Sequence, residues 1–201
     1  MSADAIVTVF WLIALFASIT VHEFMHAWSA NYLGDPTAKA MGRVSLNPIA
    51  HIDLFGTIIL PLILILSQAG FVFGWAKPVQ INPNNFKDYR KGQALSALAG
   101  PVANLLMILF FSIIYKLVPS GTLFSIFLTI LVQLNIVLMV FNLIPVPPLD
   151  GSKVLYAFLP FDTIRKLEQY GPFLLIFVFL FGGRLIFPII TAISNFLGVG
   201  F

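Results

Sequence analysis

Long apolar runs, several of them long enough to cross a lipid bilayer, dominate this sequence and restrict what it can fold into. Hydrophobic residues make up 59% of the 201 residues and charged residues only 9%, and the mean hydropathy is +0.98. Ordinary soluble domains do not have this composition. The chain, residues 1–201, is therefore predicted to be one all-α polytopic membrane domain with about four to six transmembrane segments of roughly 17–25 residues each.

Four apolar segments are predicted to form helices: residues 5–33, 94–118, 122–144 and 172–197. The first ends at Gly34-Asp35-Pro36, a helix stop followed by a turn signal. It lacks the basic start and the small-residue cleavage site of a signal peptide, so we expect it to be retained as a first span. The last segment is expected to bend near Gly182-Gly183-Arg184 and Pro188.

Residues 52–81 are predicted to enter the membrane as a re-entrant segment and to return to the same side. Residues 54–66 are apolar, but residues 70–79 are rich in glycine and aromatic residues and contain Pro78 near their end, which favours an extended segment. Non-helical backbone at membrane depth is tolerated only where protein or a water-filled cavity covers it. We therefore expect this segment to line a cavity, with an ordinary interfacial loop as the alternative.

The basic residues lie between the apolar runs and indicate the orientation. Nine of the eleven lysines and arginines fall in residues 35–51, 77–91 and 151–170, which leaves Lys116 and Arg184. Because cytoplasmic loops carry such an excess, these three segments are expected to face the cytoplasm of a plasma-membrane protein whose N-terminus is outside. The pI of about 9.3 has the same explanation and does not indicate a nucleic-acid partner.

The first apolar run contains the pattern His22-Glu23-x-x-His26. Residues four apart share one face of a helix, so both imidazoles could hold one ion while Glu23 reaches a water beside it. This set suits a zinc hydrolase. A structural histidine pair is the alternative, but ionisable residues inside a span are costly and mark functional sites. The chain has no cysteine, which excludes thiolate ligands and a cysteine nucleophile.

A catalytic zinc takes three protein ligands and keeps one position open, so a third ligand is needed. Asp150 follows a span that runs inward and should emerge at the depth of His22 and His26. It lies in an apolar stretch interrupted by prolines, where an aspartate has no evident structural reason to occur. N-capping of the next helix is an alternative role. His51 and Asp53 are the other candidates for the third ligand.

Together these motifs resemble the site-2 protease family of intramembrane zinc metalloproteases. The resemblance rests on His22-Glu23-x-x-His26 and on the later Asn142-x-x-Pro145-x-Pro147-x-Leu149-Asp150-Gly151. The sequences Gly100-Pro101-x-x-Asn104 and Phe73-Gly74-Trp75-Ala76-Lys77-Pro78 are similar to compact bacterial members, and the similarity covers residues 6–160. Larger relatives carry PDZ or nucleotide-sensing domains, which are not expected in this chain.

The resemblance implies roles for individual residues. His22, His26 and Asp150 would hold one Zn²⁺ per chain, Glu23 would act as the catalytic base, and Asn142 would contact the substrate backbone near the scissile bond. The implied substrates are transmembrane proteins or peptides that are cleaved within or near a membrane-spanning segment.

The segment of residues 71–79 is expected to pair with the substrate as an added strand, with Gly74 and Trp75 as contacts. Asn104 is expected to join a polar network between helices, and His51 to have a structural or substrate-contacting role ahead of metal binding. Two other functional classes stay open. A metal or ion transporter could use the same residues, but no inverted repeat is seen. An inactive helix-binding scaffold would be expected to lack the base or a ligand.

Overall fold

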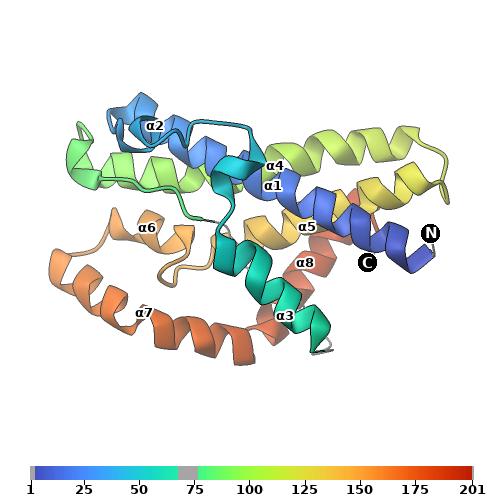
Figure 1. Ribbon diagram of the computed structural model, residues 1–201. Helices are drawn as coiled ribbons and strands as arrows, with labels where there is room; N and C mark the ends of the chain where they lie inside the picture. The colour runs from blue at the N-terminus through green and yellow to red at the C-terminus, as the bar shows by residue number, and fades with distance from the viewer. Residues whose placement is uncertain (1–2, 68–76, 201) are drawn as a thin grey trace.

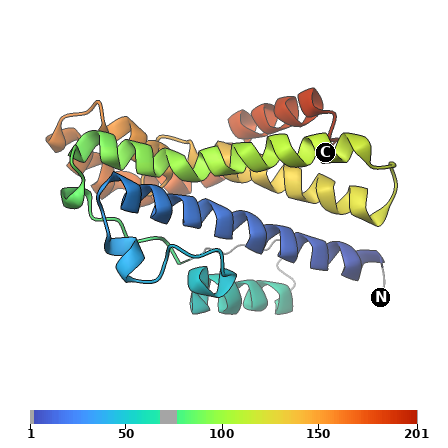
Figure 2. The same ribbon diagram turned by 90° about the horizontal axis from the view of Figure 1, so that it is seen from above.

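The computed structural model describes residues 3–67 and 77–200, and over these ranges the chain consists of helices and connecting loops without a strand. Three long helices form the body of the protein: α1 (Ala3–Leu33), α4 (Tyr89–Leu117) and α5 (Leu123–Asn142). They lie side by side along their lengths in both views (Figure 1; Figure 2). The three helices predicted from the corresponding apolar runs are thereby confirmed.

These three helices are long and apolar enough to cross a membrane, with mean hydropathies of 2.1, 2.2 and 2.5. A fourth candidate span is the pair α7 (Phe161–Phe181) and α8 (Gly183–Leu197), which is bent by 66°. The predicted bend at Gly182-Gly183 is confirmed, whereas α8 continues through Pro188. The all-α polytopic architecture is confirmed, and the three or four candidate spans among the described residues lie at or just below the lower end of the expected range.

Small residues let the three long helices approach one another closely. Ala14, Ala27 and Ala30 of α1 are fully buried, and Gly100 and Ala103 of α4 are buried as well. Close backbone approach is favourable in a membrane, where lipid tails remove the hydrophobic drive for helix association. Two apolar clusters complete the packing around α5: Ala14, Ile130, Leu131 and Leu134 on one side, and Ile108, Val132, Ile136, Ile190 and Val199 on the other.

One end of the bundle gathers the polar connectors. It holds α2 (Thr37–Ala40), the turn η3 (Pro83–Asn85) before α4, the helix α6 (Asp150–Tyr156) and the start of α7 (Figure 1). The N-terminus and the turn between α4 and α5 lie at the opposite end (Figure 1; Figure 2). The three basic segments that were predicted to share one side of the membrane therefore converge at one end of the fold.

Gly34 and Asp35 end α1 at this side. Gly34 has φ of +114°, a conformation that glycine adopts far more readily than other residues. The buried Asp35 carboxylate accepts hydrogen bonds from the hydroxyl and N–H of Thr37, the Asn85 side chain and the Asn82 N–H. Burial raises the pKa of Asp35, but these four bonds lower it more, so its pKa lies below the usual value. This carboxylate ties the end of α1 to the segment before α4.

The segment predicted to be re-entrant begins as a helix, formed by the π-helical η2 (Leu54–Ile59) and by α3 (Leu60–Leu66). Its proposed return to the same membrane side stays a prediction. Most of the extended part also stays a prediction, because it lies outside the described residues: residues 71–76, including Gly74 and Trp75.

Candidate metal centre

His22 and His26 lie one turn apart on the buried face of α1. Their exposed fractions are 6% and 5%, and their rings meet edge to face with centroids 4.6 Å apart. The Nε2 atoms of the two rings are 3.0 Å apart. The four-residue spacing thus turns both imidazoles toward one point, as the sequence pattern predicts.

Asp150 completes a group of three possible ligands. Its Oδ2 atom lies 3.2 Å from Nε2 of His22 and 3.2 Å from Nε2 of His26. Zinc bound tetrahedrally at about 2.0–2.1 Å holds neighbouring ligand atoms about 3.3 Å apart. The near-equilateral triangle of 3.0–3.2 Å therefore fits a zinc-sized cation, with its fourth position left to water or substrate.

The turn between α5 and α6 brings Asp150 to the histidines. The N-cap of α6 is Leu149, and no side-chain hydrogen bond caps this helix, so the alternative role of Asp150 as N-cap is wrong. Gly151 lies so close to the end of α5 that a Cβ atom there would be 2.2 Å from the Leu143 carbonyl oxygen. The glycine lets α6 start directly against α5, which directs the preceding carboxylate back toward α1.

Gly100 of α4 lies directly against the two imidazoles. A Cβ atom at this position would lie 2.3 Å from Nε2 of His26 and 2.6 Å from Nε2 of His22. Real Cβ atoms essentially never approach other atoms this closely. The next residue, Pro101, has no N–H and interrupts the backbone hydrogen bonds of α4 in the same turn. The Gly100-Pro101 sequence therefore leaves room for two imidazoles where α4 passes them.

The outer nitrogen of each ring contacts an acceptor. Nδ1 of His22 is 2.6 Å from Oδ1 of Asn104, and Nδ1 of His26 is 2.7 Å from the Ser96 carbonyl oxygen. A carbonyl acceptor requires a proton on Nδ1, which leaves a lone pair on each Nε2 atom. Two nitrogen lone pairs and a carboxylate oxygen then face one another, an arrangement that suits a bound cation.

The carboxylate of Asp150 is available to such a cation in its charged form. Burial raises the pKa of Asp150, but the charges and hydrogen bonds of His26 and His22 outweigh this effect and hold the pKa well below its usual range. A bound cation would replace the protons on these imidazoles, because a histidine binds a metal only in its neutral form. Two neutral imidazoles and one carboxylate would then give the ligand group a single negative charge.

Glu23 is held by the chain segment that precedes α4. Its Oε2 atom accepts a hydrogen bond of 3.0 Å from the N–H of Val79. Two residues earlier, the N–H of Lys77 donates to the His51 carbonyl oxygen at 2.9 Å. The carboxylate next to the histidine pair is thus positioned by backbone from another part of the chain.

The structure does not bring the other candidate ligands to this group. His51 is 2% exposed, and its Nε2 donates to the Ser45 carbonyl oxygen at 2.8 Å. Asp53 caps η2 by accepting a 2.7 Å hydrogen bond from the Gly56 N–H. Among the described residues, the histidine and acidic side chains that could share one metal ion are His22, His26 and Asp150.

Asn142, the remaining described residue with a predicted role, is the last residue of α5. Its Nδ2 donates to the Leu138 carbonyl oxygen at 3.0 Å. Gly74 and Trp75 lie outside the described residues. Sequence reasoning overlooked Ser18, Ser96 and Asn135, which lie buried next to the site; a polar residue within an apolar span was the available signal.

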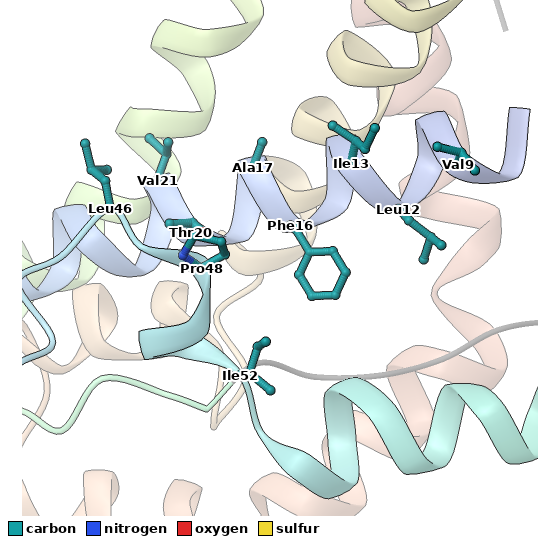
Figure 3. Close-up of a pocket in the computed structure, with 10 residues that line it drawn as sticks. All are labelled: Val9, Leu12, Ile13, Phe16, Ala17, Thr20, Val21, Leu46, Pro48 and Ile52. Atoms are coloured by element: carbon teal, nitrogen blue, oxygen red, sulfur yellow. The ribbon is translucent and has the colours of Figure 1, made fainter. Parts of the chain in front are cut away.

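An apolar groove of about 660 Å³ runs along α1 between Val9 and Val21. One wall is a face of α1, and the other is formed by the segment that leads from α2 to η2 (Figure 3). The lining side chains are Val9, Leu12, Ile13, Phe16, Ala17, Thr20, Val21, Leu46, Pro48 and Ile52. Thr20 and Val21 directly precede His22 in the sequence, so this end of the groove lies within one helical turn of the histidine pair.

Comparison with known proteins places the chain in a family. The model of "Peptidase family M50" matches residues 117–183. The chain is 41% identical over 195 residues to "Putative zinc metalloprotease YwhC" of Bacillus subtilis (strain 168), covering 90% of this chain and 85% of the relative. It is 30% identical to "Putative zinc metalloprotease Rip2" of Mycolicibacterium smegmatis, over 90% of this chain and 71% of the relative.

A Rip2 protein of Mycobacterium tuberculosis (strain ATCC 25618 / H37Rv) is 29% identical over 84% of this chain and 62% of the relative. No solved structure matches the chain. The match to the relative that is 41% identical covers most of both chains. The chain therefore belongs to peptidase family M50, the site-2 protease family, and is a metalloendopeptidase of that type.

Proposed function

We propose that this protein is an intramembrane zinc metalloprotease that hydrolyses a peptide bond within or near the transmembrane segment of membrane-protein substrates. The observation that carries the proposal is the triangle of His22, His26 and Asp150, with Glu23 adjacent, inside a bundle of membrane-spanning helices. The names of the relatives, which specify zinc, support the same ion here.

His22, His26 and Asp150 are the proposed ligands of one zinc ion per chain. When bound, zinc lowers the pKa of a coordinated water and polarises the scissile carbonyl. Glu23 is the proposed general base: it takes a proton from the attacking water and delivers it to the leaving amine as the C–N bond breaks. The bond from the Val79 N–H holds this carboxylate in place before the substrate arrives.

The substrate is proposed to be a membrane-spanning helix that unwinds locally, because a helix hides its carbonyl groups in internal hydrogen bonds. The groove along α1 supports this proposal, since it is apolar and its lining includes Thr20 and Val21, which directly precede His22 (Figure 3). Residues 71–79 would pair with the unwound chain as an added strand, with Gly74 and Trp75 as contacts. Asn142 would contact the substrate backbone.

The active site is proposed to lie toward the cytoplasmic side of a plasma-membrane protein, with the N-terminus outside. The convergence of the three basic segments at the end of the bundle that holds α6 supports this orientation. Water can reach a site near this face more easily than one at the centre of the bilayer.

The first experiment measures zinc per chain in purified full-length protein, because this requires no substrate. We expect about one zinc per chain in the wild type, loss of zinc in Asp150→Ala and retention in His51→Ala. Wild-type protein that holds no zinc after zinc is supplied would contradict the proposal. Zinc that survives Asp150→Ala but not His51→Ala would overturn the choice of third ligand.

The second experiment tests Glu23 on a panel of single-span membrane proteins reconstituted with the enzyme. Glu23→Gln should lower cleavage by about 10²–10⁴-fold, the usual contribution of a general base, while zinc content stays unchanged. Cleavage at the wild-type rate would show that another group takes the proton.

A further inference from the structure

A chain of buried polar side chains lies behind His22. Ser18, Asn104 and Asn135 are each fully buried, on α1, α4 and α5 respectively. Asn104 joins His22 at 2.6 Å and Asn135 at 2.7 Å. Asn135 in turn contacts the Ser18 hydroxyl and the Leu131 carbonyl oxygen, both at 2.8 Å. The chain thus begins at a main-chain carbonyl and ends at a proposed zinc ligand.

The Leu131 carbonyl sets the direction of every bond in this chain. A main-chain carbonyl can only accept, so Asn135 must turn its NH₂ group toward it and its Oδ1 toward Asn104. Asn104 must then donate its NH₂ group to Asn135, which turns its own Oδ1 toward His22. An acceptor at this position requires the proton on Nδ1, so the Nε2 lone pair faces the site.

We propose that Asn135 is a positioning residue of the metal centre, which acts through Asn104 to fix the ring orientation and tautomer of His22. The inference rests on the proposed function in one respect, namely that His22 holds the zinc. The side chain of Asn135 forms its hydrogen bonds with Leu131, Ser18 and Asn104, so it reaches the ligand triangle only through Asn104.

The two histidines differ in the acceptor that their Nδ1 atoms face, and this difference explains why His22 needs a second amide behind Asn104. His26 donates to the carbonyl oxygen of Ser96, a main-chain acceptor whose chemistry cannot change. His22 instead faces a side-chain amide, which presents an acceptor in one orientation and a donor in the other. Only the second amide, anchored on the Leu131 carbonyl, decides between these two orientations.

A packing role alone does not account for this arrangement. Polar side chains do join helices in membranes, and Asn104 and Asn135 link α4 to α5 in this manner. Packing would be served equally by an amide pair turned the other way round. Here each amide turns its oxygen toward His22 and its NH₂ group toward Leu131. The last bond reaches Nδ1 of His22, while Nε2 of the same ring faces His26 and Asp150.

The test is the zinc dissociation constant of the purified full-length protein, measured by competition with a chromophoric chelator. We expect Asn104→Leu and Asn135→Leu each to weaken zinc binding by about 10–100-fold, the usual effect of losing a group that orients a ligand. The double variant should bind zinc no more weakly than Asn104→Leu, because Asn135 acts through Asn104. Asn104→Asp keeps an acceptor for His22 and should restore most of the affinity.

Ser112→Ala is the matched control, since Ser112 is a buried polar residue of α4 outside this chain of bonds. It should leave zinc affinity unchanged. Asn135→Ala replaces Asn135→Leu if the larger side chain prevents folding. In the Co²⁺-loaded protein, the visible absorption spectrum should change in Asn135→Leu and remain as in the wild type in Ser112→Ala, which separates a change at the ligands from a general loss of stability.

The outcomes separate this inference from the proposed function. Wild-type protein that binds no zinc would overturn both. Wild-type binding with unchanged affinity in Asn135→Leu would overturn the positioning role alone. A double variant that binds zinc much more weakly than Asn104→Leu would also overturn it, because Asn135 would then act independently of Asn104.

Discussion

Val79 donates its backbone N–H to the carboxylate of Glu23 at 3.0 Å, although the two residues are 56 positions apart in the sequence. The bond joins the described end of the predicted substrate-pairing segment to the proposed catalytic base. Because the donor is main chain, most side-chain substitutions at this position preserve the bond, and proline alone removes it.

Val79→Pro should therefore lower cleavage while zinc content stays at the wild-type value. A hydrogen bond to a charged group is worth about 1.5–3 kcal/mol, which corresponds to about 10–100-fold in rate if the bond positions the base. Val79→Ala keeps the N–H and is the control, which should cleave at close to the wild-type rate. Equal losses in both variants would mean that the side chain, rather than the N–H, is what matters.

Gly100→Ala should weaken zinc binding at the candidate metal centre. The added Cβ atom would lie 2.3 Å from Nε2 of His26, so the imidazoles must move apart. We expect zinc affinity to fall by about tenfold or more, as for other changes that displace a ligand, measured by chelator competition. Gly183→Ala is the control, because a Cβ atom there meets nothing within 4 Å. Wild-type affinity in Gly100→Ala would refute the close approach of α4 to the histidines.

Ala17→Trp should obstruct the groove along α1 without disturbing the zinc ligands. Ala17 lines the groove and lies more than one turn before His22 (Figure 3). We expect slower cleavage of single-span substrates with unchanged zinc content, and a smaller effect on a short soluble peptide that need not occupy the groove. Val102→Trp places the same side chain on an exposed part of α4 and should cleave normally. Normal cleavage by Ala17→Trp would exclude the groove as the substrate path.

Asp35→Asn should lower thermal stability in a pH-dependent manner. The pKa of Asp35 lies below the value of about 3.9 that an unfolded aspartate has, so its stabilising contribution is complete above that value and is lost as the pH falls through the folded-state pKa. The melting temperatures of wild type and variant should differ most near pH 7 and converge in acid. Asp162→Asn, whose side chain is 90% exposed in the wild type, should shift the melting temperature little at any pH.

The end of α1 and the bend before α8 could be predicted because glycine marks both positions, whereas the start of α7 at Phe161 lies eleven residues before the predicted start at residue 172. Gly34 has the positive φ that ends α1, and Gly182 marks the bend before α8. The number of spans was harder to predict, because a stretch such as η2 and α3 is apolar but short. Hydropathy alone does not separate such a helix from a full span.

The histidine pair of the site could be predicted from spacing, whereas Asp150 could only be ranked above His51 and Asp53. That choice depends on the direction of the turn after α5. The close packing of Gly151 against the Leu143 carbonyl determines this direction, and such a contact cannot be predicted from the local sequence pattern. Asn135 was not found from the sequence for a related reason. Which polar residue meets which neighbour depends on the rotation of each helix, and helices that are apolar on all sides carry little information about rotation.

The distance of 124 residues between His26 and Asp150 has a consequence for how the protein is made. Synthesis delivers the two histidines and the proposed base with the first helix, but the third proposed ligand only after α4 and α5 have been synthesised. A ribosome-bound chain with α1 in the membrane therefore holds two of the three proposed ligands and no complete site. Under the proposed function, the protease becomes active only when its last core helix is in place, so the nascent chain passes through the insertion machinery before it can cut neighbouring membrane proteins.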